Sequence, residues 1–297
     1  MSNAVLSEQG ELFAKPKGSL PPMLAQYQDY KSEYPDCIIF YQVGDFYEVF
    51  FEDAVKTARI LNITLTTRDK SNTDAVPMCG VPQASVDTYL ERLVDQGHSV
   101  ALVSQINSAT SAVMPTLLRD EQGLTKTTGK VAIQRRLTRI VTPGVRILGQ
   151  GSASPAASLV VAIGFEGETP AALCWCDPQS GKVHALEDLT EDELARQLET
   201  LEPKEIIAPK RLSERSLDFR NTLLRRLRQA LPAAIFKFRG SARRRAGSLR
   251  DLSLIPGYSG RSSGCKFGLQ LLIDYLDETV CGEQLPILEI GQAASHS

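Results

Sequence analysis

The chain has 297 residues, 42% of them hydrophobic, and a formal net charge of −2. That length allows two domains, each with a buried core. No apolar stretch reaches the length of a membrane span, and the N-terminus lacks the basic start and apolar centre of a signal peptide, so we expect a cytoplasmic protein with no membrane partner. The cysteines are scattered and the histidines offer no zinc-site spacing, so we expect no metal.

Charge is unevenly distributed along the chain. Residues 1–107 contain eight Lys/Arg against fourteen Asp/Glu, whereas residues 208–261 contain fourteen Lys/Arg against three Asp/Glu. The basic stretch 208–261 is compatible with a phosphate contact, an acidic partner or a solvated surface.

Residues 1–18 show no hydrophobic periodicity, which predicts a disordered tail. Over residues 19–146 strands and helices alternate, as in an α/β domain with a mixed sheet and packed helices. The predicted elements are, in chain order, a helix entered at Leu20-Pro-Pro22, a strand at 37–43, a short helix through Ala54, Ala58 and Leu61, a strand at 63–67, a helix at 86–94, and strands at 99–103 and 137–141. Residues 107–134, rich in Ser, Thr and Gly, predict a long surface loop.

Residues 147–158 are rich in Gly, Ser, Ala and Pro, and we expect a linker there. A second α/β unit is predicted over residues 159–254, because its elements follow the order β-β-β-α-β-α-β. Its first helix begins with a capping box, Thr190-Glu-Asp-Glu193. A final helix at 264–280 has a broad apolar face but too little sequence around it to form a domain.

The most informative segment is Gly-Asp-Phe-Tyr-Glu at residues 44–48, directly after the strand at 37–43. A glycine at a strand end lets the backbone leave the sheet, and the residues after it offer an aromatic ring beside carboxylates. Such a group can press a ring against a planar ligand and accept a hydrogen bond from it. Taken alone, however, Phe46 and Tyr47 are more typical of core residues at a strand end.

Several motifs occur in a fixed order around this segment, and together they resemble the amino-terminal part of the MutS family, which recognises DNA mismatches. The motifs are Met23-Leu24 with Gln26-Tyr27, Phe40-Tyr41, the segment 44–48 with Phe50, Pro77-Met78-Cys79-Gly80-Val81-Pro82, Tyr89-Leu90 with Leu93-Val94 and Gly97, Val100-Ala101 with Gln105, and Arg139-Ile-Val-Thr-Pro-Gly144. Residues 159–254 are similar to the family's RNase H-like connector domain. Residues 255–297 look like the truncated start of its helical core.

The resemblance implies a role for two side chains. Phe46 would enter the minor groove and stack on a mispaired base, and Glu48 would hydrogen-bond that base. A wedge must part a base step, which costs less where a mismatch already weakens the stack. Tyr47 keeps a structural role, because neighbouring side chains in a strand point to opposite faces.

The other motif residues have supporting roles. Those expected to shape the wedge region are Gly44, Asp45, Met78, Gly80 and Pro82, with the segment 77–82 as a turn. The candidate phosphate contacts are Arg59, Arg68 and Lys70. Because residues 1–107 are net acidic, other parts of the protein must help to hold DNA.

Some features depart from the family pattern. Ser104 stands where a glutamate is usual, Val145 where a threonine is common, and the loop 107–134 is longer than usual. The family's clamp and ATPase segments are not seen, and the closest approach to a P-loop, at residues 123–131, has the wrong glycine spacing. We therefore expect no catalytic activity and no cofactor in this chain, with ATP binding confined to full-length relatives.

Three alternatives remain. The RNase H-like unit could be a nuclease, although Asp177 lies in a turn and the acidic residues 191–193 suit a helix start. The connector could be a protein-interaction module for MutL, or the chain a truncated paralogue without function. The resemblance thus implies mismatched duplex DNA as the ligand, MutL and other MutS-like chains as candidate partners, and a cytoplasmic, nucleoid-associated location.

Overall fold

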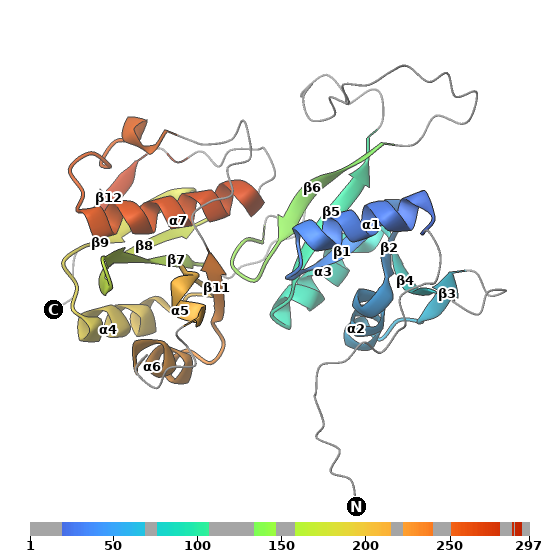
Figure 1. The fold of residues 1–297 in the computed structure, drawn as a ribbon, viewed down its shortest axis with the longest axis horizontal. Coiled ribbons are helices and arrows are strands. Elements are labelled where there is room, and N and C mark those ends of the chain that lie inside the picture. The colour runs from blue at the N-terminus through green and yellow to red at the C-terminus, as the bar shows by residue number, and fades with distance from the viewer. Residues whose placement is uncertain are drawn as a thin grey trace, which may run out of the picture.

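The computed structural model describes residues 20–68, 76–106, 134–146, 158–214, 222–239, 251–279, 287 and 289–292. The tail expected at 1–18 lies outside these residues, as do most of the loop expected at 107–134 and of the linker at 147–158. The described chain forms two α/β units, each built on a six-stranded mixed sheet (Figure 1). This confirms the predicted fold class.

The first sheet has the strand order β3-β4-β2-β1-β5-β6, in which β1 and β5 run parallel and the other neighbours antiparallel. The elements of this unit are α1 (Pro22–Glu33), β1 (Cys37–Val43), β2 (Phe46–Phe50), α2 (Phe51–Leu61), β3 (Thr66–Arg68), β4 (Val76–Pro82), η1 (Gln83–Ser85), α3 (Val86–Asp95), β5 (Ser99–Gln105) and β6 (Arg135–Val141).

Helices cover both faces of the first sheet. Ile38 and Phe40 pack with α2 and α3 on one face, whereas Ile39 and Tyr41 pack with α1 on the other. Figure 1 shows α1 lying across its face of the sheet. Because both faces are covered, β1 reads as a continuous apolar run rather than an alternating one.

The segment 77–82 differs from the expected turn, because it lies within strand β4, in which Met78 to Pro82 pair with β2. Its prolines and glycine argue against a strand. The burial pattern explains the outcome: Pro77, Cys79 and Val81 are buried, and the residues between them are more exposed. This period-two pattern outweighs the turn-forming composition.

The second sheet has the order β11-β10-β7-β8-β9-β12. Its unit contains β7 (Val160–Glu166), β8 (Thr169–Asp177), β9 (Lys182–Leu186), α4 (Glu191–Leu201), β10 (Glu205–Pro209), α5 (Arg211–Glu214), α6 (Thr222–Ala230), β11 (Ile235–Arg239), η3 (Leu252–Leu254), α7 (Ser263–Thr279) and β12 (Ile290–Gln292). The predicted capping box is confirmed, since the Thr190 side chain accepts from Glu193 N and the Glu193 carboxylate accepts from Thr190 N.

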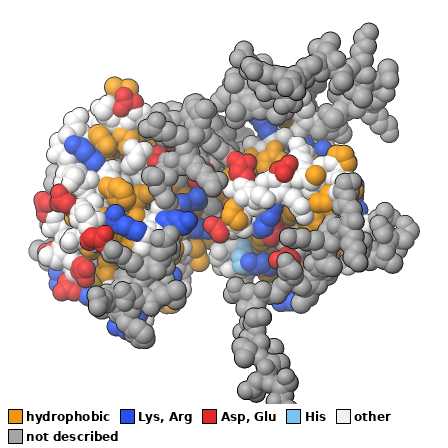
Figure 2. Space-filling view, in the orientation of Figure 1, with side chains coloured by type: hydrophobic (Ala, Val, Ile, Leu, Met, Phe, Trp, Pro, Cys, Tyr) orange, Lys and Arg blue, Asp and Glu red, His pale blue; other side chains and the backbone are white. Residues whose placement is uncertain are grey.

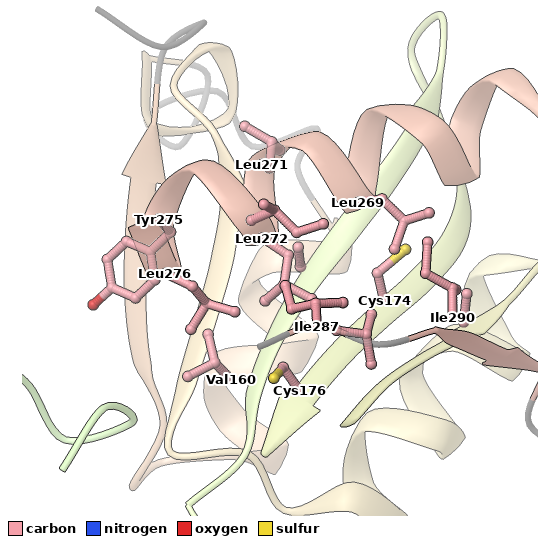
Figure 3. Packing of buried hydrophobic residues seen from close by; sticks show 14 of the residues in the cluster. Val160, Cys174, Cys176, Leu269, Leu271, Leu272, Tyr275, Leu276, Ile287 and Ile290 are labelled. Carbon is pink, nitrogen blue, oxygen red and sulfur yellow. The ribbon is translucent and has the colours of Figure 1, made fainter. Parts of the chain in front are cut away.

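Helix α7 was expected to begin a separate helical core, but in the structure it packs on the second sheet. Leu269, Leu272 and Leu276 pack against Val160 and Cys174 of the second sheet (Figure 3). This face lies opposite the one that α4 and α6 cover. The apolar face of α7 was visible in the sequence, but its partner was not.

Glycines allow α7 to lie close to the second sheet. A Cβ at Gly164 of β7 would lie 2.3 Å from the carbonyl oxygen of Gly264, and one at Gly268 would lie 3.0 Å from the Sγ of Cys174. The helix and strand backbones therefore meet where side chains would otherwise separate them. Within the described residues, no helix is long and apolar enough to cross a bilayer.

Candidate nucleic-acid interface

A two-residue turn joins β1 to β2 and presents the segment 44–48 at the end of a hairpin. Val43 pairs with Phe46 across the turn, and Gly44 has a φ of +59°, a conformation that side chains with a Cβ adopt rarely. The carbonyl oxygen of Asp45 accepts from Gln83 N at 2.8 Å. Gly44 thus makes the turn, and the start of η1 fixes its position.

The side-chain amide of Gln42 holds the same turn in place through hydrogen bonds. Its Nε2 donates to Gln83 Oε1 at 3.0 Å and to the carbonyl oxygen of Gly44 at 3.2 Å, and its Oε1 accepts from Gln105 N at 2.9 Å. These bonds join β1, the turn, η1 and β5. The hairpin end is therefore held by polar contacts from several elements.

Side chains alternate along β2, so that Phe46 and Glu48 share one face and Tyr47 takes the other. Phe46 is 49% exposed, whereas Tyr47 is buried and its hydroxyl lies 2.8 Å from the Oγ of Ser104. Leaving a phenylalanine in water forgoes about 2 kcal/mol of burial. The structural role expected for Tyr47 agrees with its burial, whereas Phe46 has a large apolar ring that is half exposed.

Strand β4 supplies the residues opposite. Met78, Gly80 and Pro82 pair with Phe50, Glu48 and Phe46 respectively, so all lie on this same face of the sheet. A Cβ at Gly80 would lie 3.3 Å from the carbonyl oxygen of Tyr47 and 3.7 Å from the Cγ of Glu48, a tight fit beside the glutamate. The glycine therefore keeps this position open.

The carboxylate of Glu48 lies in a partly buried, cationic environment. Its Oε2 is 3.3 Å from Nη1 of Arg68. Burial raises the pKa of Glu48 above its usual value, and the positive charges of Arg68 and Arg135 act against that rise. The carboxyl group is thus closer to neutrality than an exposed glutamate.

Arg135 was not predicted from the sequence. Its Nε donates to the carbonyl oxygen of Gln42 at 2.7 Å, and its guanidinium lies 4.8 Å from the ring centroid of Tyr41, which pairs with Glu48. Arg135 is the first residue of β6 and is far from residue 48 in the chain. Only the strand order β2-β1-β5-β6 brings it to this face.

We call the set Phe46, Glu48, Arg68 and Arg135, with Gly80 and Pro82, the hairpin face. The other two candidate phosphate contacts, Arg59 and Lys70, are not part of this set. Arg59 is exposed on α2, which covers the opposite face of the sheet, so it does not join the hairpin face. Lys70 lies outside the described residues.

The nuclease alternative gains no support from the carboxylates named for it. Asp177 Oδ1 accepts from Gln179 N at 3.0 Å within the turn after β8, Asp192 pairs with Arg226, and Glu193 closes the capping box. Among the described residues, no three His, Cys, Asp or Glu gather as a metal site would require.

Two α/β units, the first of which exposes an aromatic ring beside a partly buried carboxylate, define a two-domain protein with a candidate nucleic-acid face. Residues 21–149 match MutS domain I, and residues 158–286 match MutS domain II. The second match includes α7, in agreement with its packing on the second sheet. The chain belongs to the MutS family.

Individual relatives agree with this assignment. The chain is 35% identical over 196 residues to the DNA mismatch repair protein MutS of Staphylococcus carnosus, and 34% identical over 193 residues to that of Staphylococcus haemolyticus. The first alignment covers 66% of this chain and the second 65%, but each covers only 20% of the relative. The chain therefore spans about a fifth of the length of these relatives.

Proposed function

We propose that this chain is the mismatch-recognition and connector part of a DNA mismatch repair protein, and that it binds mismatched or looped duplex DNA through Phe46 and Glu48. The observation that carries the proposal is the half-exposed ring of Phe46 on the same strand face as Glu48, within a MutS domain I.

The position of Phe46 suits a wedge. An apolar side chain that enters the minor groove must unstack a base step, at a cost of a few kcal/mol. The cost is smaller at a mismatch, so selectivity comes from the deformability of the duplex and not from its sequence. A wedge must also be held rigidly, and Phe46 stands on a short hairpin fixed by Gln42 and Gln83.

Glu48 contributes a second means of discrimination. A carboxylate close to phosphates is repelled unless it meets a base donor or takes up a proton, so it opposes well-paired DNA as well as favouring an unpaired base. The raised pKa of Glu48 makes protonation easier once phosphates approach. Arg68 and Arg135 limit the rise, and in this proposal they also contact the phosphates beside the wedge.

The test is fluorescence anisotropy at low salt with a labelled duplex carrying one G·T mismatch and its fully paired counterpart. We expect tighter binding to the mismatched duplex and loss of that preference in Phe46→Ala. The control variant is Leu254→Ala, whose side chain is 79% exposed on the second unit, away from the hairpin face. Equal affinity of the intact chain for both duplexes, or an unchanged preference in Phe46→Ala, would contradict the proposal.

A second candidate function is partner binding by the connector. Arg228 of α6 lies 5.7 Å from the ring centroid of Phe236 and 6.0 Å from that of Phe238, within the basic stretch 208–261. A guanidinium fixed over aromatic rings suits an acidic protein surface such as one on MutL. Pull-down of MutL by Arg228→Glu and by Phe46→Ala separates the two functions, because only the first substitution should weaken it.

A further inference from the structure

A cleft of about 520 Å³ lies between the two units. The first unit contributes Lys31 of α1, Lys56 of α2 and His98, and the second contributes Lys210 and Lys237. Figure 2 shows Lys and Arg side chains on both units where they face each other. This volume is within the range of small-molecule sites.

Positive charge exceeds negative charge in this cleft. Four lysines line it against two carboxylates, Asp36 and Asp53. Lys31 offsets the charge of Asp53, since Nζ and Oδ1 are 3.0 Å apart. Of the other lysines, Lys56 and Lys237 alone outnumber the one remaining carboxylate, Asp36.

Two other groups in the cleft respond to the same positive charge. Burial lowers the pKa of His98, and Lys56 and Lys237 lower it further. Burial raises the pKa of the Cys37 thiol to about 11, while Lys237, Arg239 and Lys31 act in the opposite direction. Nearby positive charge favours the neutral form of a histidine and the anionic form of a cysteine, so it lowers the pKa of both groups.

Lys237 already crosses between the units. Its Nζ donates to the Oγ of Ser99 at the start of β5, at 3.1 Å. An ammonium group has three donors, so this bond leaves capacity for an anion. The contact also fixes the ammonium in place, which lowers the entropy lost when a ligand binds.

We propose that this cleft binds a small phosphate-bearing anion, with Lys56 of the first unit on one side and Lys237 of the second unit on the other. A phosphate dianion carries several acceptor oxygens and can accept from lysines on both units at once, whereas a lone carboxylate offers fewer. Inorganic phosphate and a mononucleotide both carry this group, and a cleft of about 520 Å³ has room for either. Because the anion contacts both units, its binding favours the arrangement in which they face each other.

The experiment is isothermal titration of the intact chain at low ionic strength with inorganic phosphate, AMP and adenosine in separate runs. We expect saturable binding of phosphate and AMP but not of adenosine. Tighter binding of AMP than of phosphate assigns the site to a nucleotide, and equal binding assigns it to the phosphate group alone.

Variants test the location of the site. Lys56→Gln and Lys237→Gln should each weaken binding about tenfold, the usual effect of losing a charge-assisted hydrogen bond. Lys56 is exposed, so its loss should not impair folding. The control is Lys182→Gln at the exposed start of β9, and Phe46→Ala should also bind normally, because this site is independent of the hairpin face. Absence of saturable binding, or equal weakening by Lys182→Gln and Lys56→Gln, would overturn the proposal.

Discussion

The hydroxyl of Tyr275 on α7 donates to Oε2 of Glu205 on β10 at 2.8 Å, in the interior where the two units meet. Thr142, which follows β6 of the first unit, donates to the same oxygen at 2.8 Å. A Cβ at Gly144 would lie 2.7 Å from that oxygen, so the first unit approaches as closely as a glycine allows. One buried carboxyl therefore joins the end of the first sheet, the second sheet and its covering helix.

The first prediction concerns the Tyr275 hydroxyl. Tyr275→Phe keeps the ring in the core but removes a donor to a buried carboxyl, so we expect the free energy of unfolding to fall by about 1–3 kcal/mol. Chemical denaturation followed by circular dichroism measures the change. Tyr89→Phe on α3 is the control, since Tyr89 is only partly buried. A Tyr275→Phe variant as stable as the parent would show that this hydrogen bond makes no net contribution to the free energy of unfolding.

The second prediction concerns the pH dependence of stability. Burial raises the pKa of Glu205 above its ordinary value of 4.5, while the Thr142 hydroxyl, Lys237, Tyr275 and the backbone of Gly144 lower it. Since the pKa is higher in the folded state, the folded protein holds the proton more tightly. The stability that Glu205 contributes is thus fully present below pH 4.5 and is lost as the pH rises through the raised folded pKa.

Glu205→Gln removes this titration and keeps the shape of the side chain. We expect the difference in stability between Glu205→Gln and the parent to shift in favour of the glutamine as the pH rises above 4.5. Denaturation curves across a pH series measure it. Parallel curves for the two proteins over the whole series would mean that Glu205 does not titrate in this range.

The third prediction concerns Arg68 of the hairpin face. Its ion pair with Glu48 is partly exposed, so Arg68→Gln should change the free energy of unfolding by no more than about 1 kcal/mol. Its positive charge lowers the pKa of Glu48, so the same substitution should raise that pKa. Titration of the Glu48 carboxyl by NMR measures the effect.

Arg59→Gln is the matched control for Arg68→Gln, because α2 holds Arg59 on the other face of the sheet. If Arg68 also meets phosphate, Arg68→Gln weakens binding to mismatched and paired duplex alike, since a phosphate contact carries no base information. Arg59→Gln should leave both affinities unchanged. An equal loss of affinity in the two variants would place the DNA on both faces and contradict the site as described.

Sequence patterns predicted those parts of the fold that depend on local spacing. Each of these parts depends on neighbours within a few residues, and each is present. They are the apolar run of β1, the apolar face of α3 and the capping box at Thr190. Strand β4 was not predicted, because its prolines and glycine are typical of a turn. Its alternating buried and exposed residues form a strand only because β2 pairs with them. Local patterns fail where a neighbouring strand decides the conformation.

The sequence likewise predicted only part of the candidate site. Phe46 and Glu48 stand in one short segment, so their shared face follows from strand geometry alone. The sequence could not predict that Arg135 lies at this site or that the Gln42 and Gln83 side chains hydrogen-bond to each other. Both features depend on the order of strands in the sheet. Glu205 gave no signal either, since a single glutamate in a strand reveals nothing of the hydroxyl groups that surround it.

The last prediction tests whether α7 is part of the second unit. Leu272 is fully buried against the second sheet, so Leu272→Ala removes apolar contacts and leaves a cavity. Substitutions of this kind cost about 2–5 kcal/mol, and we expect the second unit to unfold at lower denaturant concentration. The single tryptophan, Trp175, lies on β8 of this sheet, so its fluorescence reports the unfolding of the second unit directly. Leu254→Ala is the control, because Leu254 is 79% exposed and its loss should have little effect. If α7 instead belonged to an independent helical domain, Leu272→Ala would leave the tryptophan transition where it is in the parent.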